Sequence, residues 1–331
     1  MKKADAIFCA DLHIRPDRPV CRMDEDYTEE QFRKLRFIID LQAKHDCPLF
    51  VAGDFGDAAG ERCWKPWLLS RVITEIGVRR HEQCNKSNRV EFGIHVIPGQ
   101  HDLPEHRLDA VEKSGLFVID SAECIISQPK LRSDYWVVPN RDKTKGDCFV
   151  VTFMPWGGDD PAFPVLVKTD RLVIRDVLLG HRMTVYDNPI YPGQKDPTAL
   201  QFLKSHPQYD LIVLGDNHQS FMVEHAGRKL ISPGSMMRMT ADQFDHEPSV
   251  YLWWAETNDV ERVKIPVRPA AEVITREHID RTQARDMRME AFVESLKKTY
   301  EVGLSFRENL KQHFASNRTR KAIESKVWEC L

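Results

Sequence analysis

The stretch "GIHVIPGQHD" (residues 93–102) joins an apolar run to a loop rich in chemically active side chains. The run is dominated by β-branched residues, which predicts a short buried strand, and Pro98-Gly99 ends it in a tight turn. Gln100, His101 and Asp102 follow directly. A carboxamide, an imidazole and a carboxylate at the end of a buried strand are typical of the edge where α/β proteins place their active sites.

The same pattern of apolar runs and helical periodicity recurs along the chain. Further buried strands are predicted at residues 6–10, 48–53, 148–155, 176–181 and 210–216. Helices are predicted between several of them, at residues 28–45, 65–80 and 196–206. The first helix opens with a capping box from Thr28 to Gln31. The strand pattern continues at residues 229–239, 249–256 and 260–267. Strands interleaved with helices predict an α/β fold with layered sheets.

Length and composition narrow the class of protein. With 331 residues the chain exceeds what one core usually supports, so we expect one large domain with an appendage. A net charge of -3 excludes a general polyanion binder, and any contact with DNA then needs local basic patches. The N-terminal apolar run is shorter than a signal peptide requires, and none reaches transmembrane length. Eight scattered cysteines fit a reducing compartment. We therefore expect a cytoplasmic protein without a membrane partner.

Polar side chains stand at the ends of five predicted strands. They are Asp11 and His13, Asp54 and Asp57, Gln100 to Asp102, His181, and Asp216 with His218. Any one of them alone is more typical of a turn or a helix cap, but strand ends in an open α/β sheet converge on one crevice. Oxygen and imidazole ligands without thiolate favour manganese, magnesium, iron or zinc. The set is large enough for two ions that share a carboxylate.

In this order the motifs resemble those of the calcineurin-like metallophosphoesterases. The family pattern is DxH, GDxxD, GNHD, a histidine after a later strand, and GHxH. It is matched here by "DLH" (11–13), "GDFGD" (53–57), "GQHD" (99–102), "GH" (180–181) and "GDNH" (215–218). The resemblance covers residues 1–270 and implies a layered metallophosphoesterase β-sandwich flanked by helices.

The resemblance also implies a role for each matched residue. It implies that one metal is bound by Asp11, His13 and His218, that the other is bound by Gln100, His181 and Asp216, and that Asp54 bridges the two. It further implies that His101 is the catalytic histidine and that Asp102 orients it.

Two ligand positions depart from the family pattern. Gln100 stands where the family has Asn, and Asp216 stands where it has His. An anionic oxygen at the second position shifts metal preference from zinc toward harder ions. We therefore expect two divalent ions, manganese (Mn²⁺) in the first place and magnesium (Mg²⁺) as the alternative. That the two departures disable the second site remains open.

Within the superfamily the chain is most similar to the SbcD-type DNA repair nucleases of phages and bacteria. The features that carry this similarity are a long segment after "DLH", the stretch "SPGSMMRM" (232–239) and a helical C-terminus. The similarity implies a metal-dependent DNA exonuclease and endonuclease whose partners are DNA and an SbcC-type coiled-coil ATPase subunit; a homodimer is also compatible with it. Arginines beside the ligand loops are candidate phosphate contacts: Arg15, Arg18, Arg22, Arg107, Arg182 and Arg238.

Two other functions fit the same residues. One is a small-molecule or nucleotide phosphodiesterase or phosphatase with the same two-metal site, which needs no basic path to the crevice. The other is a scaffold protein with a degenerate metal site.

The C-terminal segment differs in pattern from the rest of the chain. We predict a catalytic domain at residues 1–270 and a small helical appendage at residues 271–331. Apolar residues recur there at helical spacing, as Phe306, Leu310 and Phe314 and again as Ile323 and Val327. These stripes are candidates for docking the ATPase partner. The alternative is that they pack on the catalytic core.

Overall fold

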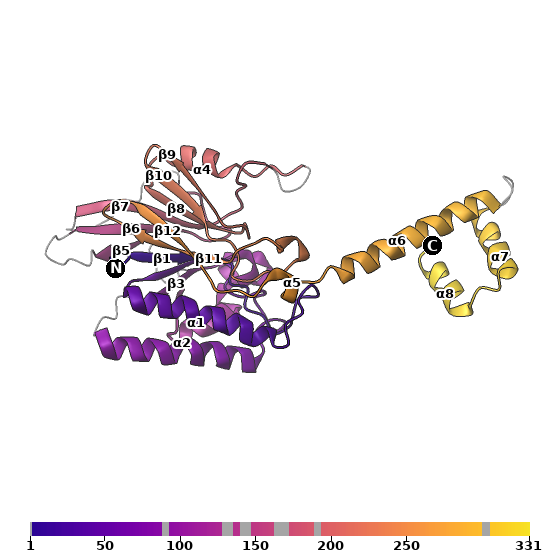
Figure 1. Ribbon diagram of the computed structural model, residues 1–331, viewed down its shortest axis with the longest axis horizontal. Coiled ribbons are helices and arrows are strands. Elements are labelled where there is room, and N and C mark those ends of the chain that lie inside the picture. The colour runs from indigo at the N-terminus through magenta and orange to yellow at the C-terminus, as the bar shows by residue number, and fades with distance from the viewer. Residues whose placement is uncertain are drawn as a thin grey trace. The chain divides into compact units, whose positions relative to one another are not determined.

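We describe the protein from a computed structural model. It describes residues 2–87, 93–127, 135–139, 147–161, 172–188, 193–299 and 305–331. The chain divides into two compact units, Met1–Ile274 and Thr275–Leu331, and Figure 1 draws the elements of each. Among the described residues, no helix combines the length and the apolar character needed to span a bilayer.

Two mixed sheets form the frame of the first unit, each with six strands among the described residues. The first has the order β12-β11-β1-β2-β3-β4, with bounds Asp259–Lys264, Ser249–Trp254, Ala6–Cys9, Leu49–Ala52, Ile94–Ile97 and Ile126–Ser127. The second has the order β5-β6-β7-β8-β10-β9, with bounds Tyr135–Pro139, Asp147–Met154, Leu172–His181, Leu211–Gly215, Arg228–Ser232 and Phe221–His225. In the first sheet β1, β2, β3 and β4 are parallel, and β11 and β12 pair antiparallel at one edge. In the second sheet β6, β7, β8 and β10 are parallel, and β5 and β9 pair antiparallel at the two edges.

The two sheets pack face to face through an apolar core. Successive side chains of a strand point to opposite faces, so Phe8 of β1 points between the sheets while Ile7 points to the helices. Phe8 stacks on Phe50, with 5.4 Å between ring centroids, and Trp253 packs edge-on against Phe8. These rings are fully buried. The packing confirms the predicted α/β fold with two layered sheets.

Helices cover the outer face of each sheet (Figure 1). α1 (Tyr27–His45), α2 (Pro66–Ser87) and α3 (Gly115–Ser121) pack on the first sheet, and α4 (Ala199–Ser205) packs on the second. The predicted capping box at Thr28 is wrong. Asp26 caps α1 instead, because its carboxylate accepts the Glu29 N–H at 2.8 Å and starts the helix earlier.

The remaining elements of the first unit are short. They are the 3₁₀ turns η1 (Gln100–Asp102), η2 (Pro104–His106), η3 (Leu108–Lys113) and η4 (Ala241–Gln243), and helix α5 (Ala270–Val273). The first three continue the loop that follows β3. The stretch at 229–239 is a strand only as far as Ser232, and its remainder is loop that runs beside the first ligand motif, where the Met236 N–H donates to the Asp11 carbonyl at 3.1 Å.

The second unit is built from α6 (Glu277–Thr299), α7 (Phe306–Ser316) and α8 (Lys321–Glu329). The Ser305 capping box at the start of α7 is confirmed. Leu310 and Phe314 are buried, and they contact Val327 and other apolar residues of the same unit. Part of each predicted stripe therefore forms the unit's own small core.

A lysine is buried beside the loop that supports the first ligand motif. Lys34 of α1 is 2% exposed and donates to the Met236 carbonyl at 3.1 Å. Burial, with a smaller contribution from the positive charges of Arg22 and Arg238, lowers the pKa of Lys34 from 10.5 to about 7.

This lysine predicts a pH dependence of stability. Because the folded pKa lies below the unfolded one, the unfolded state binds more protons between pH 7 and 10, and stability from this group rises over that interval. We expect Lys34→Met to remove the rise, measured as the urea midpoint at each pH. Lys44→Met, an exposed position on α1, is the control. An equal rise in Lys34→Met would contradict the assignment.

Candidate metal centre

Backbone hydrogen bonds tie the strand-end loops of the two sheets together. The Asp11 N–H donates to the Gly53 carbonyl at 3.1 Å, which joins the loops after β1 and β2. The His101 N–H donates to Asp54 Oδ1 at 2.9 Å, which adds the loop after β3. The Asp216 N–H donates to Asp11 Oδ1 at 3.1 Å and links the loop after β8 in the other sheet. The loops therefore form one connected layer.

Several of these residues have a left-handed backbone. Asp11, His13, Asp54 and Asp216 have φ values of 50°, 43°, 50° and 84°. This region is sparsely populated by residues other than glycine, and it persists where surrounding structure holds it. Gly53, at φ +85°, has a further constraint, because a Cβ there would lie 2.1 Å from His181 Nδ1. These backbone conformations direct side chains of the strand-end loops toward the same site.

Three groups of potential ligands lie close together. They are Asp11, His13 and His218; His13, Asp54 and His101; and Asp11, Asp54 and His181, and within each group the ligand atoms lie within 4.8 Å of one another. Asp11 and Asp54 belong to the third group together and to one other group each. The structure thus brings together five of the seven predicted ligands around shared carboxylates.

The other two predicted ligands lie beside each other. Gln100 Nε2 donates to Asp216 Oδ1 at 2.7 Å, which leaves Gln100 Oε1 without a hydrogen bond among the described residues. Gln100 and Asp216 are only partly buried, unlike Asp11 and Asp54. Their roles as ligands stay predictions.

The histidines are oriented as metal ligands usually are. His181 Nδ1 faces the Ala52 carbonyl at 2.6 Å, and a carbonyl can only accept, so Nδ1 carries the proton. His181 Nε2 is then the nitrogen that faces the centre, 3.4 Å from Asp54 Oδ2. His13 Nδ1 lies 3.4 Å from the Asp57 carboxylate, and its Nε2 lies 3.1 Å from His218 Nε2. The carbonyl behind the His181 ring fixes the nitrogen that faces the centre, and a carboxylate lies within ion-pair distance of the outer nitrogen of His13.

Several inward-facing atoms make no hydrogen bond among the described residues. The buried atoms without a hydrogen bond include Asp11 Oδ2, Asp54 Oδ2 and His181 Nε2. Buried polar atoms without partners are costly, and a cation would satisfy all three. Carboxylate oxygens with imidazole nitrogens suit manganese, magnesium or zinc. The residues present therefore fit divalent metal ions.

The electrostatics of the cluster also favour cations. Burial is the largest cause that raises the pKa of Asp11 to about 7, and Asp54 adds to it. Burial opposes the charged form of His181, but Asp54 and Asp11 raise its pKa to about 10 overall. Burial and then the charge of His13 lower the pKa of His218 to about 3. Asp11 and His181 thus hold protons that a metal ion would displace.

The predicted role of Asp102 needs correction. Its buried carboxylate accepts three backbone N–H groups, from Phe55 at 3.1 Å, Gly56 at 2.9 Å and Gly99 at 3.0 Å. His101 Nδ1 instead faces the carbonyl of Asp57 at 3.0 Å. Asp102 therefore holds the two loops, and the backbone of Asp57 orients the imidazole.

Asp57 contacts two histidines of the centre. Its carbonyl lies behind His101, while its carboxylate lies near His13 Nδ1 and pairs with Arg15 at 3.1 Å. The signal was present as the second acidic residue of "GDFGD". One residue thus supports both the histidine of the metal cluster and the predicted catalytic histidine.

The six candidate DNA-binding arginines differ in their surroundings. Arg22 and Arg238 are buried and donate to Asp24 and to backbone carbonyls, so they hold the "SPGSMMRM" loop in place and are not free for phosphate. Arg18 donates to the Asp24 carbonyl. Those three lie among structural contacts rather than beside the centre.

The other three arginines are closer to solvent. Arg107 pairs with Asp109 and Arg182 with Asp160, in both cases at the surface. Arg15 pairs with Asp57 and lines a cavity that also contains His101. Arg15 is therefore the candidate that shares a cavity with the predicted catalytic histidine.

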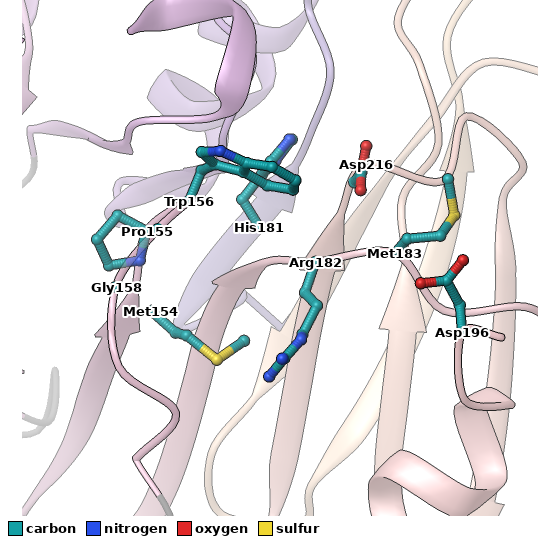
Figure 2. Close-up of a pocket in the computed structure, with 10 residues that line it drawn as sticks. Met154, Pro155, Trp156, Gly158, His181, Arg182, Met183, Asp196 and Asp216 are labelled. Carbon is teal, nitrogen blue, oxygen red and sulfur yellow. The ribbon is translucent and has the colours of Figure 1, made fainter. Parts of the chain in front are cut away.

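Two cavities reach the centre through different residues. One, of about 580 Å³, contains Gln100 and His101 and is lined also by Arg15 and Arg62. The other, of about 530 Å³, contains His181 and Asp216. Figure 2 shows the second cavity with Trp156 beside the His181 ring. Two cavities among the described residues are thus lined by residues of the centre.

No family model and no curated protein matches this chain. Solved structures do match. An archaeal phosphodiesterase is 12% identical, covering 78% of this chain and 98% of its own, with a TM-score of 0.36. A hypothetical protein from Pyrococcus horikoshii is 11% identical over 85% and 93%, with a TM-score of 0.37. A candidate 5′-nucleotidase from Staphylococcus aureus is 14% identical over 85% and 58%, with a TM-score of 0.44. At these values the likeness carries no inference about activity.

The shared carboxylate predicts a loss of metal binding. In Asp54→Asn the side chain keeps an oxygen for the His101 N–H but loses its charge, so every group that contains it should weaken. We expect Mn²⁺ affinity to fall by at least ~10-fold in calorimetric titration, the range seen when supporting or ligating groups are lost. Asp259→Asn, at an exposed strand position, is the control. An unchanged titration would contradict the assignment of Asp54 as a ligand.

The pKa shifts predict how metal binding depends on pH. Protons on Asp11, with a pKa of about 7, and on His181, with a pKa of about 10, must leave before these atoms can bind a cation. Apparent Mn²⁺ affinity should therefore rise as pH increases from 6 to 9. The released protons should be detected because the measured binding enthalpy changes with the ionisation enthalpy of the buffer. A titration curve that is flat over this range would refute the prediction.

Proposed function

We propose that the protein is a metal-dependent phosphodiesterase of the calcineurin-like metallophosphoesterase type and that its substrate is DNA. The observation that carries the proposal is the convergence of Asp11, His13, Asp54, His181 and His218 from the strand ends of both sheets. The five residues come from the motifs that resemble the family, in the family's order. The SbcD-type resemblance supports the choice of DNA.

The chemistry of such a centre would be divided between cations and protein groups. Asp11, His13, Asp54, His181 and His218 would hold divalent cations, which would supply an activated water and neutralise phosphate oxygens. His101 supplies proton transfer. Because its Nδ1 faces the Asp57 carbonyl, its Nε2 is the nitrogen left to face substrate, and a protonated ring donates from there to the leaving oxygen. The His101 and His13 rings lie 5.0 Å apart, so the acid stands beside the ligand cluster.

The two cavities support a diester rather than a monoester. A phosphodiester carries a substituent on each side of the phosphorus, and one cavity reaches the centre at His101 while the other reaches it at His181. Arg15 and Arg62 line the cavity on the His101 side and suit a neighbouring backbone phosphate.

A second candidate is a nucleotide phosphodiesterase without a DNA path. It is favoured by the burial of Arg22 and Arg238, which removes two of the six arginines that argued for a long phosphate backbone. Its substrate would fill the two cavities and extend no further.

Variants of His101 and Arg62 test the chemistry and the substrate. His101→Ala should keep Mn²⁺ affinity but lose ~10²–10⁴ in rate on a small diester such as bis(p-nitrophenyl) phosphate. Loss of Mn²⁺ binding in His101→Ala would instead identify His101 as a metal ligand.

Arg62→Ala should weaken binding of single-stranded DNA and reduce the salt dependence of that binding, while leaving hydrolysis of the small diester unaffected. Equal effects on both substrates, or no hydrolysis of DNA, would favour the nucleotide enzyme, and no Mn²⁺-dependent hydrolysis of any diester would refute the proposal.

A further inference from the structure

The cavity beside His181 has a composition unlike that of a phosphate site. Its apolar wall includes Met154, Trp156 and Met183, and its volume of about 530 Å³ lies in the range that accommodates small ligands. Two carboxylates, Asp196 and Asp216, line it as well. Negative charge there opposes a second phosphate, so a flat, neutral group is the occupant that the lining favours.

The arginine that lines the cavity is already engaged. Arg182 pairs with Asp160 at 3.0 Å, and Asp160 also accepts from His206 at 2.8 Å. Arg182 is therefore neutralised at the surface rather than aimed at a ligand. This leaves Trp156 as the largest recognition surface in the cavity.

Trp156 sits on a turn that is fixed on both sides. Its own N–H donates to the carbonyl of Pro98 at 3.0 Å, immediately before the loop that carries Gln100 and His101. The Gly158 N–H closes the turn by donating to the Pro155 carbonyl at 3.0 Å. Beyond the turn, Asp160 is held as described above. These contacts position the backbone before any ligand arrives, which lowers the cost of binding.

The indole lies beside His181, a predicted metal ligand. It is partly exposed, and its ring centroid lies 6.4 Å from that of His181 at an interplanar angle of 71°. In Figure 2 the indole lies beside the His181 ring, with Asp216 and Met183 beyond it. A group stacked on Trp156 would therefore be adjacent to a phosphate held at the cluster.

We propose that Trp156 is a stacking platform for a nucleobase, so that this cavity holds the nucleoside on one side of the scissile phosphate. The inference rests on the proposed function and specifies its substrate class: diesters that carry a base. Stacking on an aromatic ring is tolerant of sequence, because every base has a π-face. The enzyme would accordingly act on all four nucleotides and discriminate against diesters that lack a base.

Matched probes with and without a base test the platform. The binding probes are dAMP and base-free deoxyribose 5-phosphate, measured by calorimetry; the hydrolysis probes are d(ApA) and its counterparts with one base removed. In Trp156→Ala we expect dAMP affinity to fall by ~5- to 100-fold, in line with stacking losses on alanine substitution. Trp156→Phe should retain most of it. Base-free deoxyribose 5-phosphate should bind equally to all forms, and Trp67→Ala, at an exposed site on α2, should match the wild type.

The outcomes separate this inference from the proposed function. If Trp156→Ala weakens both binding probes equally, or neither, the platform is overturned, whether or not diesters are hydrolysed. If the wild type hydrolyses no diester yet loses dAMP affinity selectively in Trp156→Ala, the platform stands and the proposed reaction fails. A thermal unfolding midpoint close to that of the wild type, measured for Trp156→Ala and Trp156→Phe, would confirm that the comparison is between folded proteins.

Discussion

The buried carboxylate of Asp102 is the contact on which the arrangement of the centre depends. It accepts N–H groups from Phe55 and Gly56 in the loop after β2 and from Gly99 in the loop after β3. Hydrogen bonds to a charged acceptor are the strong ones, and a fully buried carboxylate has no water to replace them. Because the two loops share this acceptor, Asp54 and His101 are held at bonding distance.

That constraint explains why so much local strain is tolerated. Asp11, His13, Asp54 and Asp216 all occupy the left-handed region, and a Cβ at Gly99 would lie 2.1 Å from Asp54 Oδ1. Each such residue costs of the order of 1–3 kcal/mol. This free-energy cost is offset by the burial of apolar side chains in the sheets, where Phe8, Phe50 and their neighbours are fully buried. The frame thus supports a layer of loops, bearing buried carboxylates, that would not be stable alone.

The fold and the convergence of the five potential metal ligands were predictable because both depend on short local motifs. A buried strand, a glycine and an acidic or imidazole residue form one short motif, and parallel strands bring such motifs to one edge. The roles of Arg22, Arg238 and Asp102 were not predictable in the same way, because they depend on which carbonyl or amide lies nearby in space. Likewise the stripe of Leu310 and Phe314 showed which face is apolar but not that its own unit covers it.

The connection between Trp156 and the loop after β3 runs through the backbone. The Trp156 N–H is bound to the Pro98 carbonyl, while the indole takes no part in that bond. A different side chain at position 156 can therefore change what the cavity accepts without releasing the loop that positions Gln100 and His101. In the same way, Asp57 orients His101 through its carbonyl and reaches His13 through its carboxylate. Contacts to the main chain thus position the loops of the centre, and the Trp156 side chain can vary without breaking them.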